Sequence, residues 1–238
     1  YKHTSFILAI FLFITSIASG QTKPNIVIIL ADDLGYGCTG PYGAPANVLQ
    51  TPAINSLAEA GMKFTNAYAP ASLCSPSRYA LLTGRYYWRD VRDWGIIQAT
   101  DPCVVPPNGN NIAARLKKEG YNTAGIGKWH LGWDWSTLDG SGMNENIQVG
   151  QWDREVRGRI ASTIDFSGEI KNGPITRGFD YYFGLLHNLD PVEVVYFEDQ
   201  GGVALMRNGD VVKRPADPAE LTKRYTDEAI DFIEKHQR

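Results

Sequence analysis

Residues 74–85 read CSPSRYALLTGR, a stretch that combines a cysteine, a proline, a serine and two arginines. Pro76 suits the first turn of a helix, and the residues after it predict a helix that runs through Leu82. Cys74 would then lie just before the amino end of this helix, where backbone N–H groups and the helix dipole attract anions. The stretch therefore predicts a cysteine beside an anion-binding position.

The same stretch resembles the signature of type I sulfatases: a cysteine, any residue, Pro-Ser-Arg and, after an aliphatic pair or near equivalent, Thr-Gly-Arg. These positions are filled here by Cys74, Pro76, Ser77, Arg78, Leu82, Thr83, Gly84 and Arg85. The resemblance implies that a maturation enzyme oxidises Cys74 to formylglycine, an aldehyde that hydrates to a diol. A sulfated diol can expel sulfate as the aldehyde reforms, whereas a sulfated serine or cysteine would keep the sulfate. A small buried cysteine beside a helix start is the alternative.

A second motif, GKWHLG, occupies residues 127–132 at the exit of a predicted strand. It resembles the second sulfatase signature, in which a lysine and a histidine are separated by one residue. If the segment is extended, Lys128 and His130 point to the same side. The resemblance implies that Lys128 binds the sulfate, that His130 hydrogen-bonds to the diol, and that Arg78 holds the diol. A surface lysine and a core histidine are the alternative.

Residues 25–30, NIVIIL, form a continuous apolar run that predicts a central strand covered on both faces. Asp32 and Asp33 follow it directly, and ligands gather at the carboxyl ends of strands in open α/β sheets. The resemblance implies that Asp32, Asp33 and the position of Cys74 bind a divalent cation, usually calcium, for which oxygen ligands are suitable. Two solvated loop acids, or a cap for the next turn, are the alternative.

Other site candidates carry weaker patterns. Asn188 lies near where the family often places a polar active-site residue, with His187 beside it, and ordinary loop polarity is the alternative for both. Arg85 is either a buried ion-pair partner that orients the motif loop or an exposed charge at a helix end. Residues 35–40, GYGCTG, fit a dinucleotide-binding glycine pattern, but the prolines that follow do not suit the helix this motif requires.

Further local patterns predict the remaining elements. Capping residues, apolar spacing and terminal glycines indicate helices after Thr51 and Asn111, ending before Gly61 and Gly120. The Asn208-Gly209 pair predicts a hairpin. We also expect an extended segment over 62–69 and strands over 121–127, 179–185 and 193–197. Residues 133–175 are assigned to loops or a family-specific insertion, and a helix is expected from residue 221 to the end of the chain. The alternation predicts an α/β protein. The resemblance implies an alkaline-phosphatase-like mixed β-sheet flanked by helices, with the carboxyl-terminal part of the fold missing.

The first residues predict export. Residues 1–20 read as a secretory signal peptide, because Lys2 precedes an apolar run that is followed by small residues. That run is too short for a comfortable membrane span, so no stable membrane anchor is expected. Residues 21–238 would form the amino-terminal part of a sulfatase catalytic domain in a secreted or periplasmic protein. Conversion of Cys74 would leave Cys38 and Cys103 either paired or as two free thiols.

Composition is typical of a globular protein, with 43% hydrophobic and 21% charged residues over 238 positions. The net charge of −3 gives no signal for nucleic acid. The resemblance implies hydrolysis of an aryl or carbohydrate sulfate ester, with a formylglycine-generating enzyme as maturation partner. Two other functions stay open. One is a phosphonate or phosphate monoester hydrolase with the same diol, and the other is a catalytically inactive, glycan-binding relative.

Overall fold

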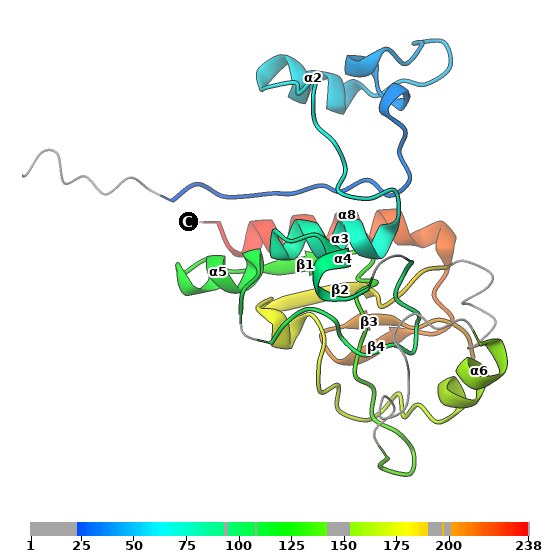
Figure 1. Cartoon of the computed structure of the whole chain (residues 1–238). Helices are drawn as coiled ribbons and strands as arrows, with labels where there is room; N and C mark the ends of the chain where they lie inside the picture. Colours follow the sequence, from blue (N-terminus) through cyan, green and yellow to red (C-terminus); the bar gives the residue numbers. More distant parts are fainter. Residues whose placement is uncertain are drawn as a thin grey trace, which may run out of the picture. The chain divides into compact units, whose positions relative to one another are not determined.

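The computed structural model describes residues 23–92, 95–107, 109–141, 153–189, 197 and 201–237 (Figure 1). These residues belong to two compact units, Tyr1–Phe64 and Thr65–Arg238. We describe each unit separately. The predicted signal peptide lies outside the described residues. None of the helices within the described ranges is long and apolar enough to cross a membrane.

The first unit contains short helical elements. Two turns of 3-10 helix, η1 (Tyr36–Cys38) and η2 (Gly40–Tyr42), precede α2 (Pro52–Ala60). The helix after Thr51 is thus confirmed, and the glycine-rich GYGCTG segment opens no α-helix, which agrees with the rejection of a dinucleotide site.

The predicted strand at residues 25–30 is wrong, because this segment forms no strand in the described structure. Its side chains are exposed, Ile29 at 84%. Continuous apolar character indicates a segment that favours burial, but a strand also needs a neighbouring edge to pair with. The unit Tyr1–Phe64 contains no strand among its described residues. The extended segment expected over 62–69 likewise forms no strand.

The second unit is built on a four-stranded mixed sheet with the order β1-β2-β3-β4. Its strands are β1 (Ala124–Ile126), β2 (Tyr181–Leu185), β3 (Leu205–Arg207) and β4 (Asp210–Lys213). β1 and β2 are parallel, with Ala124 opposite Tyr181, and the other two pairs are antiparallel. The hairpin is confirmed: Asn208, with φ of 55°, lies in the turn between β3 and β4.

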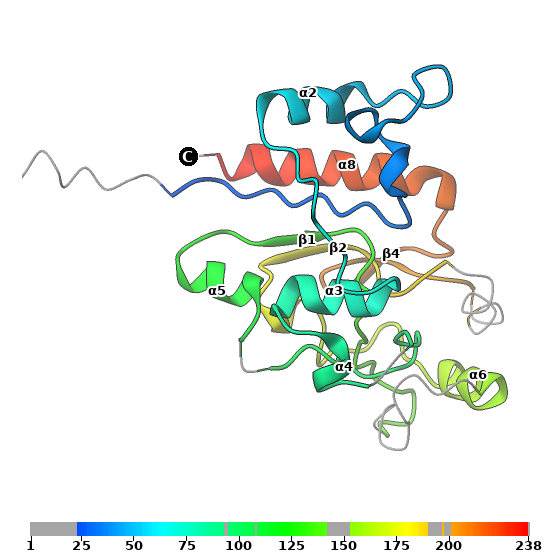
Figure 2. The same cartoon turned by 45° about the horizontal axis from the view of Figure 1, so that its top comes forward.

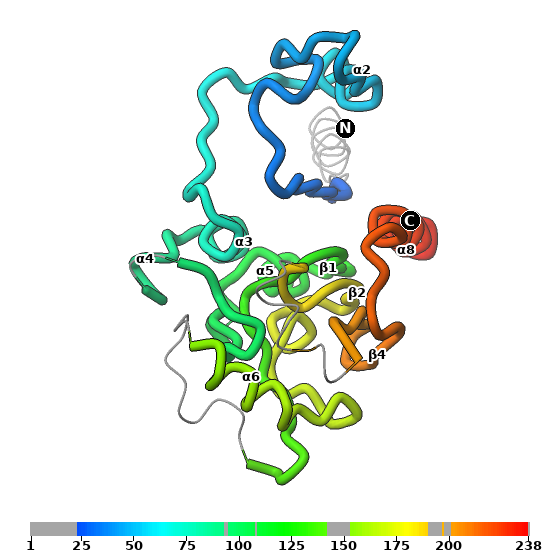
Figure 3. The backbone as a smooth tube through the Cα atoms, turned by 90° about the vertical axis from the view of Figure 1, so that its right-hand side faces the viewer, coloured from blue at the N-terminus to red at the C-terminus, as the bar shows by residue number. Residues whose placement is uncertain are grey.

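Helices cover the sheet on both sides. They are α3 (Cys74–Thr83), α4 (Tyr87–Asp90), α5 (Ile112–Lys118), α6 (Arg154–Ser162) and α8 (Pro218–Lys235), with a 3-10 turn, η3 (Ile175–Arg177). α8 lies on one side of the sheet, and α3, α4 and α6 lie on the other (Figures 2 and 3). The helices expected after Asn111 and from residue 221 are confirmed as α5 and α8, although α8 ends at Lys235 and does not run to the end of the chain.

The loop predicted over 133–175 contains a helix, so that prediction is wrong in part. Asp153 caps α6 by accepting a hydrogen bond from the Val156 N–H. The face of α6 turned to the interior carries Arg157 as well as Ala161, and both are buried. Because a charged residue occupies a buried position, the apolar spacing that marks a helix is absent. The strand expected over 193–197 lies outside the described residues apart from Phe197.

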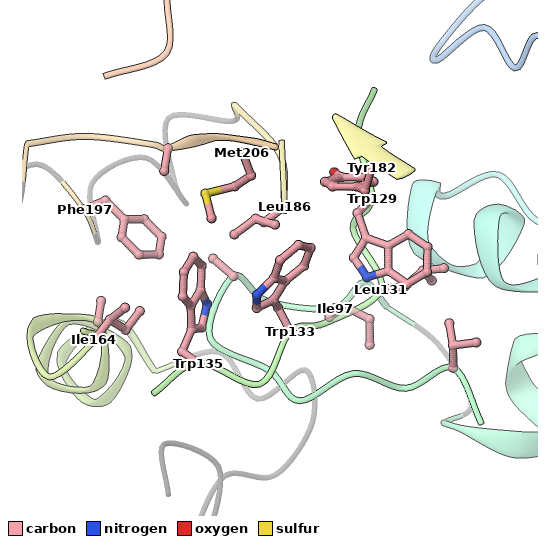
Figure 4. Packing of buried hydrophobic residues seen from close by; sticks show 14 of the residues in the cluster. Ile97, Trp129, Leu131, Trp133, Trp135, Ile164, Tyr182, Leu186, Phe197 and Met206 are labelled. Atoms are coloured by element: carbon pink, nitrogen blue, oxygen red, sulfur yellow. The ribbon is translucent and has the colours of Figure 1, made fainter. Parts of the chain in front are cut away.

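The main core lies on the side of the sheet that faces α3 and α6 and is rich in aromatic residues (Figure 4). Trp129, Trp133 and Trp135 are all buried in it, and Trp133 lies 5.7 Å from Tyr182 between ring centroids. The three tryptophans therefore fill the core. The core supports the segment that immediately follows β1, which is the GKWHLG motif.

Candidate active site

Cys74 is the first residue of α3, with Leu73 as the N-cap. The helix therefore starts at the cysteine itself, slightly earlier than predicted from Pro76. Cys74 is half-buried, while Ser75 and Pro76 behind it are buried. The hydroxyl of Ser75 accepts a hydrogen bond of 3.0 Å from the Ile97 N–H, which fastens the amino end of α3 to the core. This bond could not be predicted from the sequence, because Ser75 fills the motif position that accepts any residue.

The GKWHLG segment forms a turn with left-handed residues and is not extended, so the condition under which Lys128 and His130 would point to the same side is not met. β1 ends at Ile126, and positive φ angles follow at Gly127 (110°), His130 (56°) and Gly132 (81°). A Cβ atom at Gly132 would lie 1.7 Å from the Pro102 carbonyl oxygen. The chain must therefore bend sharply here, and only glycine fits at the last position.

The turn places Lys128 and His130 beside Cys74. Burial alone would raise the pKa of the Cys74 thiol, but a hydrogen bond with His130 and the charges of His130 and Lys128 outweigh it, so that the thiol pKa is lowered. His130 is fully buried, whereas Lys128 is half-buried. The two residues that the motif singled out thus both act electrostatically on the predicted nucleophile position.

Arg78 and Asn188 complete the cluster. Arg78 lies one turn after Cys74 on α3, and its Nη1 donates a hydrogen bond of 2.5 Å to the Lys128 carbonyl oxygen. The Lys128 Nζ donates to Asn188 Oδ1 at 3.3 Å, although the two residues are 60 positions apart in the sequence. The structure therefore brings Cys74, Arg78, Lys128, His130 and Asn188 together at the amino end of α3.

His187 and Arg85 make contacts with other residues. The His187 ring is buried and stacks on Phe197 with a centroid distance of 5.0 Å. Arg85 makes a two-pronged ion pair with Asp90, with both bonds at 2.6 Å. The Arg85 side chain is 53% exposed, so the ion pair exists but is not buried. Asp90 also accepts from the Tyr79 hydroxyl at 3.0 Å, which links the pair to α3.

Asp32 and Asp33 belong to the first unit, while the cluster around Cys74 belongs to the second. Both aspartates are exposed, and Asp33 has a φ of 57°. Within the described ranges, no three His, Cys, Asp or Glu residues gather as a metal centre would require. The cysteines 38, 74 and 103 all carry free thiols in the structure.

Sequence reasoning missed Tyr182 as part of the site's support. Its hydroxyl lies 3.0 Å from the Gly127 carbonyl oxygen and 2.8 Å from that of Leu185, so it joins the start of the turn to the end of β2. Complete burial raises the pKa of this phenol well above its ordinary value. A tyrosine in a run of strand-forming residues gives no hint of this role.

Known proteins resemble this chain over most of its length. The family model described as Sulfatase matches residues 24–238. The chain belongs to the sulfatase family. An N-acetylgalactosamine-6-O-sulfatase of Bacteroides thetaiotaomicron is 36% identical over 189 residues, which cover 79% of this chain and 32% of the relative. Arylsulfatase G of Mus musculus is 31% identical over 247 residues, covering 91% and 39% respectively. The chain thus spans about a third of the length of these relatives.

A solved structure of Ps i-CgsB in complex with k-i-k-neocarrahexaose superimposes with a TM-score of 0.59 at 28% identity, covering 90% of this chain and 42% of that one. The mixed sheet with helices on both sides is thus the alkaline-phosphatase-like fold of sulfatases, as predicted. The family resemblance of the two motifs is confirmed by the same comparisons.

Proposed function

We propose that residues 21–238 form the amino-terminal part of a sulfatase catalytic domain and that the whole protein hydrolyses an aryl or carbohydrate sulfate ester. The observation that carries this proposal is the cluster of Cys74, Arg78, Lys128, His130 and Asn188, which joins the two sulfatase motifs and Asn188 at one helix end. A helix amino end with two cationic side chains nearby suits the negatively charged group of a sulfate ester.

In this proposal Cys74 is converted to formylglycine by a maturation enzyme. One hydroxyl oxygen of the hydrated formylglycine attacks sulfur and displaces the substrate alcohol, which leaves a sulfated diol. Loss of the proton from the second hydroxyl then expels sulfate as the aldehyde reforms. Lys128 faces the sulfate and stabilises the negative charge that builds on its oxygens. His130 hydrogen-bonds to the side chain at position 74, and Asn188 holds the Lys128 ammonium and is available to the substrate.

Arg78 has a dual role in the proposal. Its bond to the Lys128 carbonyl holds the left-handed turn against α3, so it fixes the position of the lysine. Its positive charge, one helical turn from Cys74, also offsets the negative charge of the diol and sulfate.

We further propose that Asp32 and Asp33 hold a divalent cation, calcium in the first instance. Their donor set fits such an ion, since adjacent carboxylates are hard oxygen ligands and both side chains are exposed. When bound, the cation would draw electron density from the sulfate oxygens. Two aspartates do not complete the six to eight oxygen ligands that calcium takes, so water or further residues would have to fill the remaining positions.

Two further parts of the proposal concern the substrate class and the cellular location of the protein. The N-acetylgalactosamine-6-O-sulfatase relative and the neocarrahexaose complex of a structural neighbour favour a sulfated glycan over a simple aryl sulfate. Residues 1–20 support a secreted or periplasmic protein.

The test is a comparison of rates on matched aryl sulfate and aryl phosphate esters, with the full-length protein co-expressed with a formylglycine-generating enzyme. We expect the sulfate ester to be preferred, and Lys128→Ala to lower kcat/KM for it about 100-fold. Lys118→Ala is the matched control, because Lys118 is an exposed lysine at the end of α5. Preference for the phosphate ester would reassign the site to a phosphoesterase, and glycan binding without turnover would indicate an inactive relative.

A further inference from the structure

His130 adopts a backbone conformation that non-glycine residues seldom take. Its φ is 56°, in the left-handed region, where contacts between the Cβ atom and the backbone disfavour most side chains. Such a conformation persists only when surrounding contacts enforce it. The backbone on both sides is indeed fixed: the N–H groups of Trp129 and His130 donate to the carbonyl oxygens of Leu185 and Leu186, each at 2.8 Å.

Trp129 adds a contact that closes the turn over His130. Its indole Nε1 donates a hydrogen bond of 2.8 Å to the Gly132 carbonyl oxygen. This bond closes a loop around His130 and Leu131. The indole is buried and packs edge-on against Phe179, at a centroid distance of 6.2 Å. It packs in the same way against Tyr182, at 6.4 Å (Figure 4). It therefore has little freedom to move, and the carbonyl it holds cannot rotate without losing a buried bond.

Trp133 provides the contrast. It belongs to the same core cluster and is 2% exposed, yet its indole nitrogen has no hydrogen-bond partner among the described residues. Replacing either tryptophan by phenylalanine removes the same atoms from the same core. Only at position 129 does the change also remove a hydrogen bond across the turn that carries His130.

We propose that Trp129 is a positioning residue, whose indole N–H holds the turn of residues 129–132 so that the His130 imidazole stays against the side chain at position 74. The proposal rests on the proposed function, because it assigns His130 to the reaction. The proposed role is to hold the shape of the turn and not to fill the core, so Trp129→Phe and Trp133→Phe should differ in their effects.

The first test uses NMR on the chain itself and needs no activity. The chain has six tryptophans, and the indole N–H signal of Trp129 is identified by its loss in Trp129→Phe. In the unsubstituted protein this signal should exchange slowly with solvent. The His130 imidazole signal, identified by its loss in His130→Gln, should shift in Trp129→Phe and stay in place in Trp133→Phe. An indole signal at position 129 that exchanges as fast as an exposed one would overturn the proposal even if the variant failed to fold.

The second test uses the kinetics of the matured full-length enzyme. We expect Trp129→Phe to lower kcat about five- to tenfold, the loss of one neutral hydrogen bond, with KM within twofold of the unsubstituted value. Trp133→Phe should leave both constants unchanged. Equal effects of the two substitutions on the His130 signal, or no shift in either, would mean that Trp129 acts only through packing. If the enzyme had no sulfatase activity, the proposed function would fail while the NMR result still decided the role of Trp129.

Discussion

Replacing Arg157 by methionine should destabilise the protein far more than the same change two residues along the same helix. Arg157 on α6 forms an ion pair of 2.6 Å with Asp101, and the two side chains are 1% and 0% exposed. Asp101 belongs to the segment that begins at Ile97, whose N–H is bound by Ser75 next to Cys74. The ion pair therefore fastens α6 to the segment that supports the amino end of α3.

The magnitude follows from what the substitution leaves behind. Removing one partner of a buried ion pair leaves an uncompensated charge and costs about 3–5 kcal/mol. Asp101 would keep at least the hydrogen bond from the Gln98 N–H at 2.7 Å, so we expect a loss near the lower end, about 3 kcal/mol. For a domain of this size that corresponds to a fall in Tm of roughly 6–12 °C.

The control is Arg159→Met on the same helix. Arg159 pairs with Glu155 at the same distance, 2.6 Å, but the two side chains are 63% and 86% exposed. Exposed pairs of this kind contribute only about 0–1 kcal/mol. Urea unfolding followed by tryptophan fluorescence would measure both, with coincident circular dichroism transitions as the check for two-state behaviour.

The double variant Asp101→Leu/Arg157→Met completes the experiment. Because it removes both charges, it should recover most of the stability lost in Arg157→Met. Equal losses in Arg157→Met and Arg159→Met, or no recovery in the double variant, would refute the reasoning that a buried charge causes the effect.

Three further predictions follow from other contacts. Asn111→Ala should destabilise the protein by about 2 kcal/mol in urea unfolding, because the buried side chain caps α5 and also donates to a backbone carbonyl; an effect no larger than an exposed Asn110→Ala control would contradict this. Burial raises the pKa of the Cys103 thiol to about 11, so iodoacetamide at pH 8 should spare Cys103 in the folded chain while it alkylates the exposed Cys38, and equal rates would refute it. Burial opposes ionisation of Asp180, but Lys117 and the Thr123 N–H and hydroxyl lower its pKa below the ordinary value. The contribution of the ionised carboxylate to the free energy of unfolding is therefore present above about pH 4 and is lost as pH falls through the folded-state pKa. Acid should thus destabilise the unsubstituted protein more steeply than Asp180→Asn.

Local chemistry explains what the sequence could predict of the fold. Asn208-Gly209 adopts positive φ readily, and Asn111 satisfies a helix end by itself, so both elements are confirmed where the pattern placed them. Elements that depend on distant partners were predicted poorly. Residues 25–30 have the composition of a strand but no strand edge to pair with among the described residues of their unit. The buried face of α6 cannot be recognised from apolar spacing, because it carries Arg157, whose partner Asp101 lies 56 positions away.

The candidate site shows the same division. Cys74, Arg78, Lys128 and His130 could be selected from two short motifs. Their arrangement could not be predicted, because the left-handed turn is enforced by the approach of Gly132 to Pro102 and by bonds to the end of β2. Asn188 was placed near the site by its position alone, and its contact with Lys128 is a product of the parallel pairing of β1 and β2.

The central claim is that Cys74 is the precursor of the reacting group, and peptide mass spectrometry tests it most directly. The protein would be co-expressed with a formylglycine-generating enzyme and digested with trypsin, and the peptide of residues 64–78 would be examined beside that of a control sulfatase. We predict loss of the thiol mass at Cys74 and reaction of the new aldehyde with a hydrazide probe. An unmodified Cys74 that is still alkylated by iodoacetamide, under conditions that convert the control, would contradict the account.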